Sequence, residues 1–129
     1  MLQKTFYIKT LLDGRQYPIL NTFPKKYEML YELGMNKFSK SEGVKSAISS
    51  LDKVLKGESD SFELSTGDWC VVDVKKETSV ITNNFDQFEP VEIETSEIYT
   101  LMQEWCDFLI AYESGKIPGI THPDKREEV

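Results

Sequence analysis

The sequence is poor in the residues that most often carry out catalysis and bind transition metals. It has one histidine, His122, and two cysteines, Cys70 and Cys106, among 129 residues. A catalytic triad needs a rigidly held base, and His122 lies beside a proline in a polar C-terminal segment. No CxxC or HxxxH spacing indicates a zinc site, so we expect no metal. We expect both cysteines to be buried as small hydrophobic side chains, although a disulfide between them stays open at this point.

Motifs for phosphate and cofactor binding are absent as well. The seven glycines occur singly and form neither GxGxxG nor GxxxxGK[ST]. Carboxylate pairs could support glycoside hydrolysis, but a chain with this many acids forms some such pair in any fold. We therefore predict a protein without a cofactor that is not an enzyme.

Long apolar runs and excess positive charge are also missing. No stretch approaches the roughly 18–20 apolar residues that span a bilayer. The N-terminal MLQKTFYIKT lacks the apolar core of a signal peptide, so we expect a cytoplasmic protein. The net charge is −7 and the only arginines are Arg15 and Arg126. Such a chain repels polyanions, so neither nucleic acid nor a membrane is an expected partner.

The charge that is present is distributed unevenly. Residues 1–57 carry a balance of +5, and residues 58–129 carry a balance of −12. Between Lys76 and Lys116 there are nine acids and no lysine or arginine. A split of this size indicates an interaction surface for a basic partner.

An N-terminal hairpin is predicted from Phe6, Tyr7 and Ile8, whose neighbours favour strands, and from the turn residues that follow them. Residues 4–12 and 16–20 would be its strands, and Asp13-Gly14 gives a two-residue turn signal between them. Pro18 cannot donate a ladder hydrogen bond, which places its strand at a sheet edge.

Two helices are predicted to follow the hairpin. The first covers residues 24–33 and ends at Gly34. The second begins with a capping box from Ser39 to Glu42 and continues with apolar residues at helical spacing until Gly57.

The middle of the chain changes from helical to strand periodicity. Residues 61–65, 69–75 and 78–83 predict a three-stranded antiparallel meander, and residues 91–93 a further short strand. Residues 95–114 then predict a helix, capped by Thr95 or Ser96. Its apolar stripe contains Ile98, Leu101, Met102, Trp105, Phe108, Leu109 and Tyr112.

Together these elements predict a single α+β domain over residues 1–129. We expect a mainly antiparallel sheet of four to five strands, with two to three helices packed on it. Trp69, Trp105 and Phe108 are the expected anchors of the core, and residues 116–129 are expected to form a loosely ordered tail.

One part of the chain resembles a known family. DWCVVDVK from Asp68, TSVI from Thr78 and TSEIYTLMQEWCDFL from Thr95 give a hairpin, an acidic loop and a helix with the pattern T-x-E-[IL]-x-x-L-x-x-x-W-x-x-F. This region, residues 60–112, resembles small immunity proteins of bacterial polymorphic-toxin and contact-dependent growth inhibition systems. The resemblance implies a cytoplasmic, non-enzymatic protein that binds and neutralises a cognate toxin domain. It carries over no binding residue.

The predicted function is therefore that of an immunity protein that occludes the active or substrate-binding surface of a basic toxin. Loops and strand ends present charge best, and the predicted partner-binding residues are Asp60, Asp68, Asp86, Glu89, Glu92 and Glu94. Two alternatives stay open: a DNA-mimic or phage-type inhibitor, and an accessory subunit of a larger assembly. The oligomeric state is not predicted.

Overall fold

The computed structural model of this chain describes residues 2–65, 70–83 and 89–116. It confirms the predicted α+β class. In chain order the elements are β1 (Gln3–Thr10), β2 (Gln16–Phe23), the 3₁₀ helices η1 (Lys25–Gly34) and η2 (Asn36–Ser39), α1 (Ser41–Leu55), β3 (Phe62–Ser65), β4 (Cys70–Val74), β5 (Thr78–Asn83), β6 (Val91–Glu94) and α2 (Thr95–Glu113).

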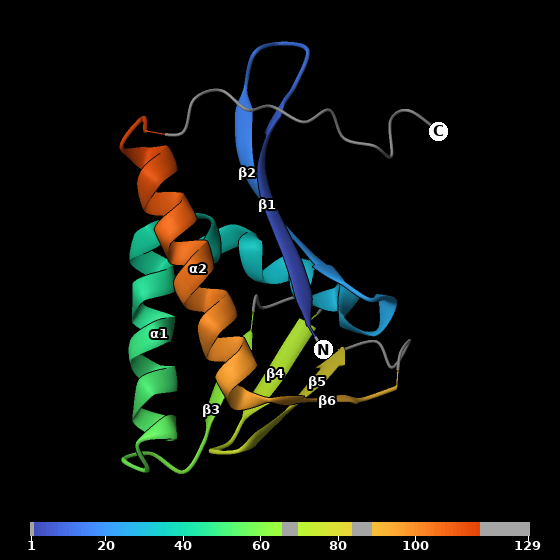
Figure 1. Cartoon of the computed structure of the whole chain (residues 1–129), viewed down its shortest axis with the longest axis vertical. Coiled ribbons are helices and arrows are strands. Elements are labelled where there is room, and N and C mark those ends of the chain that lie inside the picture. Colours follow the sequence, from blue (N-terminus) through green and yellow to red (C-terminus); the bar gives the residue numbers. More distant parts are fainter. Residues whose placement is uncertain (1, 66–69, 84–88, 117–129) are drawn as a thin grey trace.

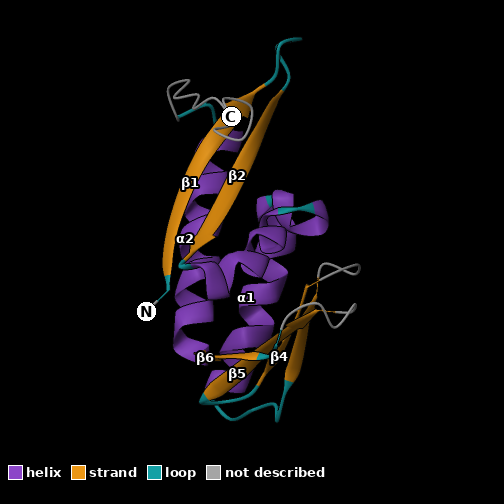
Figure 2. Cartoon of the chain, turned by 90° about the vertical axis from the view of Figure 1, so that its right-hand side faces the viewer, coloured by secondary structure: helices purple, strands orange, loops and turns teal. Residues whose placement is uncertain are grey.

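The strands form two antiparallel sheets that lie one beyond the other along the molecule (Figures 1 and 2). The first is the hairpin β1–β2, and the second is the meander β3–β4–β5–β6. Helices α1 and α2 lie side by side along one flank (Figure 1). The meander has the predicted order and gains β6 as a fourth strand.

The N-terminal hairpin pairs only with itself among the described residues and does not extend the meander. Pro18 pairs with Ile8 in this two-stranded sheet, so its predicted edge position is confirmed. The connection is longer than the two residues predicted, because the last paired residues are Thr10 and Gln16. Gly14 has a left-handed φ of 89° in this loop, a conformation that glycine adopts without strain.

Gly34 has a packing role in place of the predicted terminating one. It is the last residue of η1, and the helix is 3₁₀ throughout. A Cβ built on Gly34 would lie 2.9 Å from Leu20 Cβ and 3.2 Å from a ring carbon of Trp105. The missing side chain therefore lets η1 approach β2 and α2 closely.

Replacing Gly34 by alanine is expected to lower the free energy of unfolding by about 1–3 kcal/mol, because the added methyl overpacks this contact. Thermal denaturation would measure the change. Helix propensity alone predicts the opposite sign, a gain of up to about 1 kcal/mol, so a raised melting temperature would contradict the packing role.

The start of α1 is held by a residue distant in sequence. The helix begins at Ser41 with Lys40 as N-cap, so the predicted capping box at Ser39 is wrong. Instead, the Glu113 carboxylate at the end of α2 accepts hydrogen bonds from Ser41 N at 2.8 Å and Ser41 Oγ at 2.5 Å. Both bonds favour the charged carboxylate and lower the pKa of Glu113 below its ordinary value of 4.5, and the bond from the Ser41 hydroxyl has the larger effect.

Replacing Glu113 by alanine is expected to lower the free energy of unfolding by about 1 kcal/mol at neutral pH, as loss of a helix cap does. A group with a depressed native pKa stabilises above its unfolded pKa and loses that contribution as pH falls through the native value. The difference between wild type and variant should therefore shrink below the ordinary pKa of 4.5. Urea titrations at pH 7 and pH 3 would measure it, and a difference independent of pH would contradict the contact.

Both α-helices end as predicted at a glycine with left-handed backbone. Gly57 has φ of 78° and Gly115 has φ of 70°. After α1, Glu58 N donates to Lys53 O at 2.8 Å and Gly57 N donates to Val54 O at 3.1 Å, which is the Schellman pattern.

The first residue of α2 joins the helix to the sheet. Glu94 is the N-cap, so the predicted caps Thr95 and Ser96 are wrong. Thr95 is fully buried and its hydroxyl donates to Lys75 O. The Thr95 Oγ1 atom lies 2.7 Å from Ser79 Oγ, so the two hydroxyls are hydrogen-bonded. These bonds fix the start of α2 against the β4–β5 turn.

The core lies between the helices and the sheets. Trp105 is 0% exposed and its Nε1 donates to Phe38 O at 2.7 Å, which confirms it as an anchor. Phe6 and Phe108 contact its ring at centroid distances of 5.5 and 5.7 Å, and Phe108 is half-buried. The third predicted anchor, Trp69, lies outside the described residues.

Both cysteines are buried, as predicted, and the structure shows that they are free, which the sequence had left open. Burial raises the pKa of the Cys70 thiol to about 12, and Glu32 adds to the effect. Of the predicted tail, residues 116–129, all but Lys116 lies outside the described residues. No helix in the described ranges has the length and apolar character to cross a membrane.

Candidate functional site

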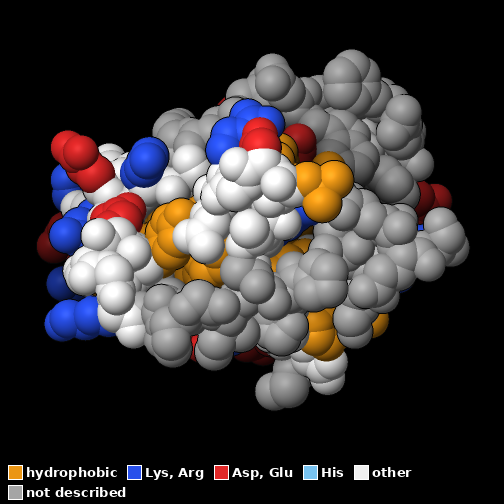
Figure 3. Space-filling model, turned by 90° about the horizontal axis from the view of Figure 1, so that it is seen from above, with side chains coloured by type: hydrophobic (Ala, Val, Ile, Leu, Met, Phe, Trp, Pro, Cys, Tyr) orange, Lys and Arg blue, Asp and Glu red, His pale blue; other side chains and the backbone are white. Residues whose placement is uncertain are grey.

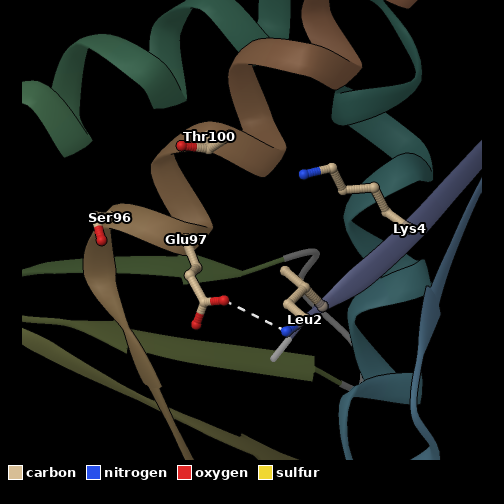
Figure 4. Close-up of a pocket in the computed structure, with 5 residues that line it drawn as sticks. All are labelled: Leu2, Lys4, Ser96, Glu97 and Thr100. Carbon is tan, nitrogen blue, oxygen red and sulfur yellow. Dashed lines mark hydrogen bonds between the residues drawn. The ribbon is translucent and has the colours of Figure 1, made fainter.

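The described part of the chain offers little for small-molecule chemistry. No group of three histidine, cysteine, aspartate or glutamate side chains is placed there to hold a metal ion. A pocket of about 230 Å³ lies between β1 and α2, lined by Leu2, Lys4, Ser96, Glu97 and Thr100 (Figure 4). Within this pocket the Glu97 carboxylate accepts from Leu2 N at 3.3 Å, so this group helps to join β1 to α2 (Figure 4).

The acids of α2 mostly stabilise the fold. Glu97 holds Leu2, Glu104 pairs with Lys4 at 2.9 Å, and Glu113 caps α1. These three carboxylates belong to the base-free stretch between Lys76 and Lys116. The acidity of that stretch therefore does not by itself define a binding surface.

A different set of acids gathers on the solvent side of the four-stranded sheet. The inner side of this sheet packs on the helices through buried residues such as Leu64, Val72 and Ile81. Alternation along each strand places the intervening residues on the outer side. We call this outer side the acidic face; its exposed carboxylates are Glu63, Asp73, Glu92 and Glu94.

The strand register aligns three of these acids in a single row across the sheet. Glu63 pairs with Asp73, Asp73 with Val80, and Val80 with Glu92. Glu94 lies beside this row, opposite Thr78. Val71 and Val80 are half-buried on the same side, so the acidic face has apolar groups between its carboxylates.

The four carboxylates of the acidic face take no part in the hydrogen bonds and ion pairs of residues 2–65, 70–83 and 89–116. Glu97, Glu104 and Glu113 of α2, in contrast, each form a hydrogen bond or an ion pair with another part of the chain. The carboxylates of the acidic face are exposed, and within the described part of the chain they add nothing to the polar contacts that hold the fold.

The pair Glu63–Asp73 is unfavourable for folding. Thr95 and Glu77 lie directly opposite one another, and Thr95 N donates to Glu77 O at 3.0 Å, so they form a hydrogen-bonded pair. Hydrogen-bonded and non-hydrogen-bonded pairs alternate along an antiparallel ladder, so this one pair determines the type of every other pair in the sheet. When this alternation is followed across β5 and β4, Glu63 and Asp73 form a non-hydrogen-bonded pair. Side chains lie closest together in pairs of this type. Like charges in this arrangement destabilise a sheet.

Replacing Asp73 by threonine is therefore expected to raise the free energy of unfolding by about 0.5 kcal/mol, since it removes the repulsion and introduces a strand-favouring residue. Urea denaturation at low salt would measure the gain. Glu63→Gln should also raise the free energy of unfolding. The double variant should gain less than the sum of the two single variants, because both single variants remove the same repulsion. Additive gains would contradict direct repulsion.

The structure places the predicted binding residues in several locations. Glu92 and Glu94 lie together on β6, on the acidic face. Asp60 precedes β3 and Glu89 precedes β6; both are exposed, but the antiparallel order places them at opposite ends of the sheet. Asp68 and Asp86 lie outside the described residues.

Glu63 and Asp73 belong to the acidic face but are not among the binding residues predicted from the sequence. Alternation in the sequence already indicated that each faces away from the core, but only the register shows that they are opposed. The sequence-based prediction selected acids in loops and at strand ends, whereas these two acids lie within strands.

The opposite end of the molecule has a different character. Seen from the hairpin end, hydrophobic side chains show near the middle, and basic and acidic side chains lie together on the side of α1 and α2 (Figure 3). Leu12 in the hairpin loop is 110% exposed and Tyr17 on β2 is 42% exposed. These two exposed apolar residues belong to the hairpin, which lies at the other end of the molecule from the four-stranded sheet (Figure 1).

Comparisons of the chain with protein-family models, with curated proteins and with solved structures found no match.

Proposed function

We propose that this chain is a non-enzymatic binding protein that neutralises a basic bacterial toxin domain, as an immunity protein does. The observation that carries the proposal is the row of carboxylates at Glu63, Asp73 and Glu92, which lies on an open sheet face and contributes nothing to the polar contacts of the described fold. The resemblance of residues 60–112 to immunity proteins supports the same function.

Charge complementarity explains why such a face would select a basic partner. Enzymes that act on polyanions bind them through lysine and arginine. A complementary acidic face attracts that surface over distance, raises the association rate and rejects acidic competitors. Occlusion of the toxin's substrate-binding surface then needs no catalysis by this chain. Such a protein would meet its toxin in the cytoplasm.

The apolar groups of the acidic face add close-range affinity to this steering. Interfaces commonly have an apolar centre within a polar rim, and the centre provides most of the binding energy. Val80 lies between Asp73 and Glu92 in the row, and Val71 lies in the neighbouring row opposite Thr82. A basic toxin surface with an apolar group between its cations would match this pattern.

The direct test is growth rescue. The wild-type chain and a variant with Glu63→Lys, Asp73→Lys and Glu92→Lys would be used to capture partners from cells of the source organism. Expression of the captured basic domain should arrest growth, and co-expression of the wild-type chain, but not of the variant, should restore it. A captured domain that is harmless, or equal rescue by both chains, would refute the proposal.

A further inference from the structure

The four-stranded sheet has two edge strands, β3 and β6, and β6 carries two of the four carboxylates of the acidic face. No described strand lies beyond β6. Figure 2 shows β6 at the lower end of the molecule, on the side turned toward the viewer. Unpaired strand edges can accept a further strand from another chain.

The ladder alternation identifies the backbone groups that this edge presents. Thr95 and Glu77 form a hydrogen-bonded pair, so Ile93 and Ser79 also do, whereas Glu92 and Glu94 are in non-hydrogen-bonded positions. The N–H and C=O of Glu92 and the N–H of Glu94 therefore point away from β5. The C=O of Glu94 belongs to the N-cap of α2.

The side chains at this edge determine which strand it admits. Glu92 and Glu94 are exposed on β6, and Glu89 lies just before it. Like charges directly opposite one another destabilise strand pairing, so these glutamates oppose pairing with a second copy of β6 or with an acidic strand. A strand with lysine or arginine at alternate positions would place opposite charges beside Glu92 and Glu94.

We propose that the partner adds an extended basic segment to β6 as a fifth, antiparallel strand, whose alternate basic side chains lie on the acidic face. The inference rests on the proposed function and specifies how that partner is held. Hydrogen bonds to the edge groups of Glu92 and Glu94 fix the register, and the carboxylates select the sequence.

The probe is a seven-residue peptide with lysine at every second position and threonine between, compared with the same peptide N-methylated at its lysine amides. In antiparallel addition, the lysines opposite Glu92 also direct their N–H groups toward β6. Both peptides carry the same charge, but only the first can form the ladder. Amide spectra of the ¹⁵N-labelled protein would follow the binding.

We expect the unmethylated peptide to shift the amide signals of Glu92 and Glu94 and to bind at least about tenfold more tightly than the methylated one. In the protein, Glu92→Pro removes the free donor at an edge position that tolerates proline, whereas Glu92→Gln removes only the charge. The proline variant should lose more affinity than the glutamine variant, with folding checked from the same spectra.

Equal binding of the two peptides, absence of binding, or shifts confined to other strands would overturn strand addition. Growth rescue does not depend on these peptides. Rescue that still requires the acidic face would then show that the proposed function stands while the edge is not used.

Discussion

Replacement of Trp105 by alanine is expected to lower the free energy of unfolding by about 3–5 kcal/mol, the usual loss for a large aromatic core residue. Trp105 is 0% exposed, and a residue this deeply packed leaves a cavity that the surroundings fill only in part. Its ring contacts Phe6 of β1 and Phe108 of α2, and its Nε1 bonds to Phe38 O. The side chain thus connects the hairpin, the 3₁₀ segment and the last helix.

Trp105→Phe separates packing from hydrogen bonding. Phenylalanine fills much of the space but removes the hydrogen bond from Trp105 Nε1 to Phe38 O, so a smaller loss of about 1–3 kcal/mol is expected. Urea denaturation followed by circular dichroism measures both variants. An unchanged unfolding midpoint for Trp105→Ala would contradict the central position of this ring.

Charge reversal on the acidic face has the second large expected effect. Asp73→Lys combined with Glu92→Lys is expected to weaken binding of the basic partner by at least about 100-fold, or about 2.7 kcal/mol. The two residues flank Val80 in the register, so both new cations would oppose the same part of the partner. Titration calorimetry at two salt concentrations would measure the loss and its dependence on screening.

Asp107→Lys is the matched control for either single reversal, Asp73→Lys or Glu92→Lys, because each of the three changes the net charge by the same amount. Asp107 is an exposed acid on α2, so its reversal changes net charge without altering the acidic face. Only a small, salt-sensitive change in affinity is expected from it. Equal losses from Asp107→Lys and from an acidic-face reversal would show that net charge, and not the acidic face, governs binding.

Features encoded in local sequence patterns were predicted well. The apolar stripe of α2, the meander and the two glycine-terminated helices follow from side-chain periodicity and backbone preference. Burial of Cys70 and Cys106 was also predicted correctly. Each of these depends on residues within a few positions of one another.

Features that depend on long-range contacts were not predictable in the same way. Ser41 and Glu113 lie at opposite ends of two helices, and only their packing brings the carboxylate to the N-terminus of α1. Glycine is a residue type that often ends helices, but Gly34 is required at its position because Leu20 and Trp105 leave no room for a side chain. Local patterns contain no information on either contact.

The candidate site was predicted in part for the same reason. A count of acids along the chain treats Glu104 and Glu92 alike, although the Glu104 carboxylate pairs with Lys4 and that of Glu92 takes no part in the polar contacts among the described residues. Glu92 and Glu94 were identified because they are near strand ends. Asp73 required the pairing of β4 with both of its neighbours before its place in the row could be known.

The most direct test of the acidic face as the contact surface is methyl cross-saturation in the complex of this chain with its captured partner. Irradiation of the partner is predicted to attenuate the methyl signals of Val71 and Val80 most strongly, because these lie among the carboxylates of the acidic face. Leu12 in the hairpin loop and Ile110 on α2 are exposed elsewhere and should keep their intensity. Strong attenuation at Leu12 or Ile110 with none at Val71 and Val80 would contradict the account.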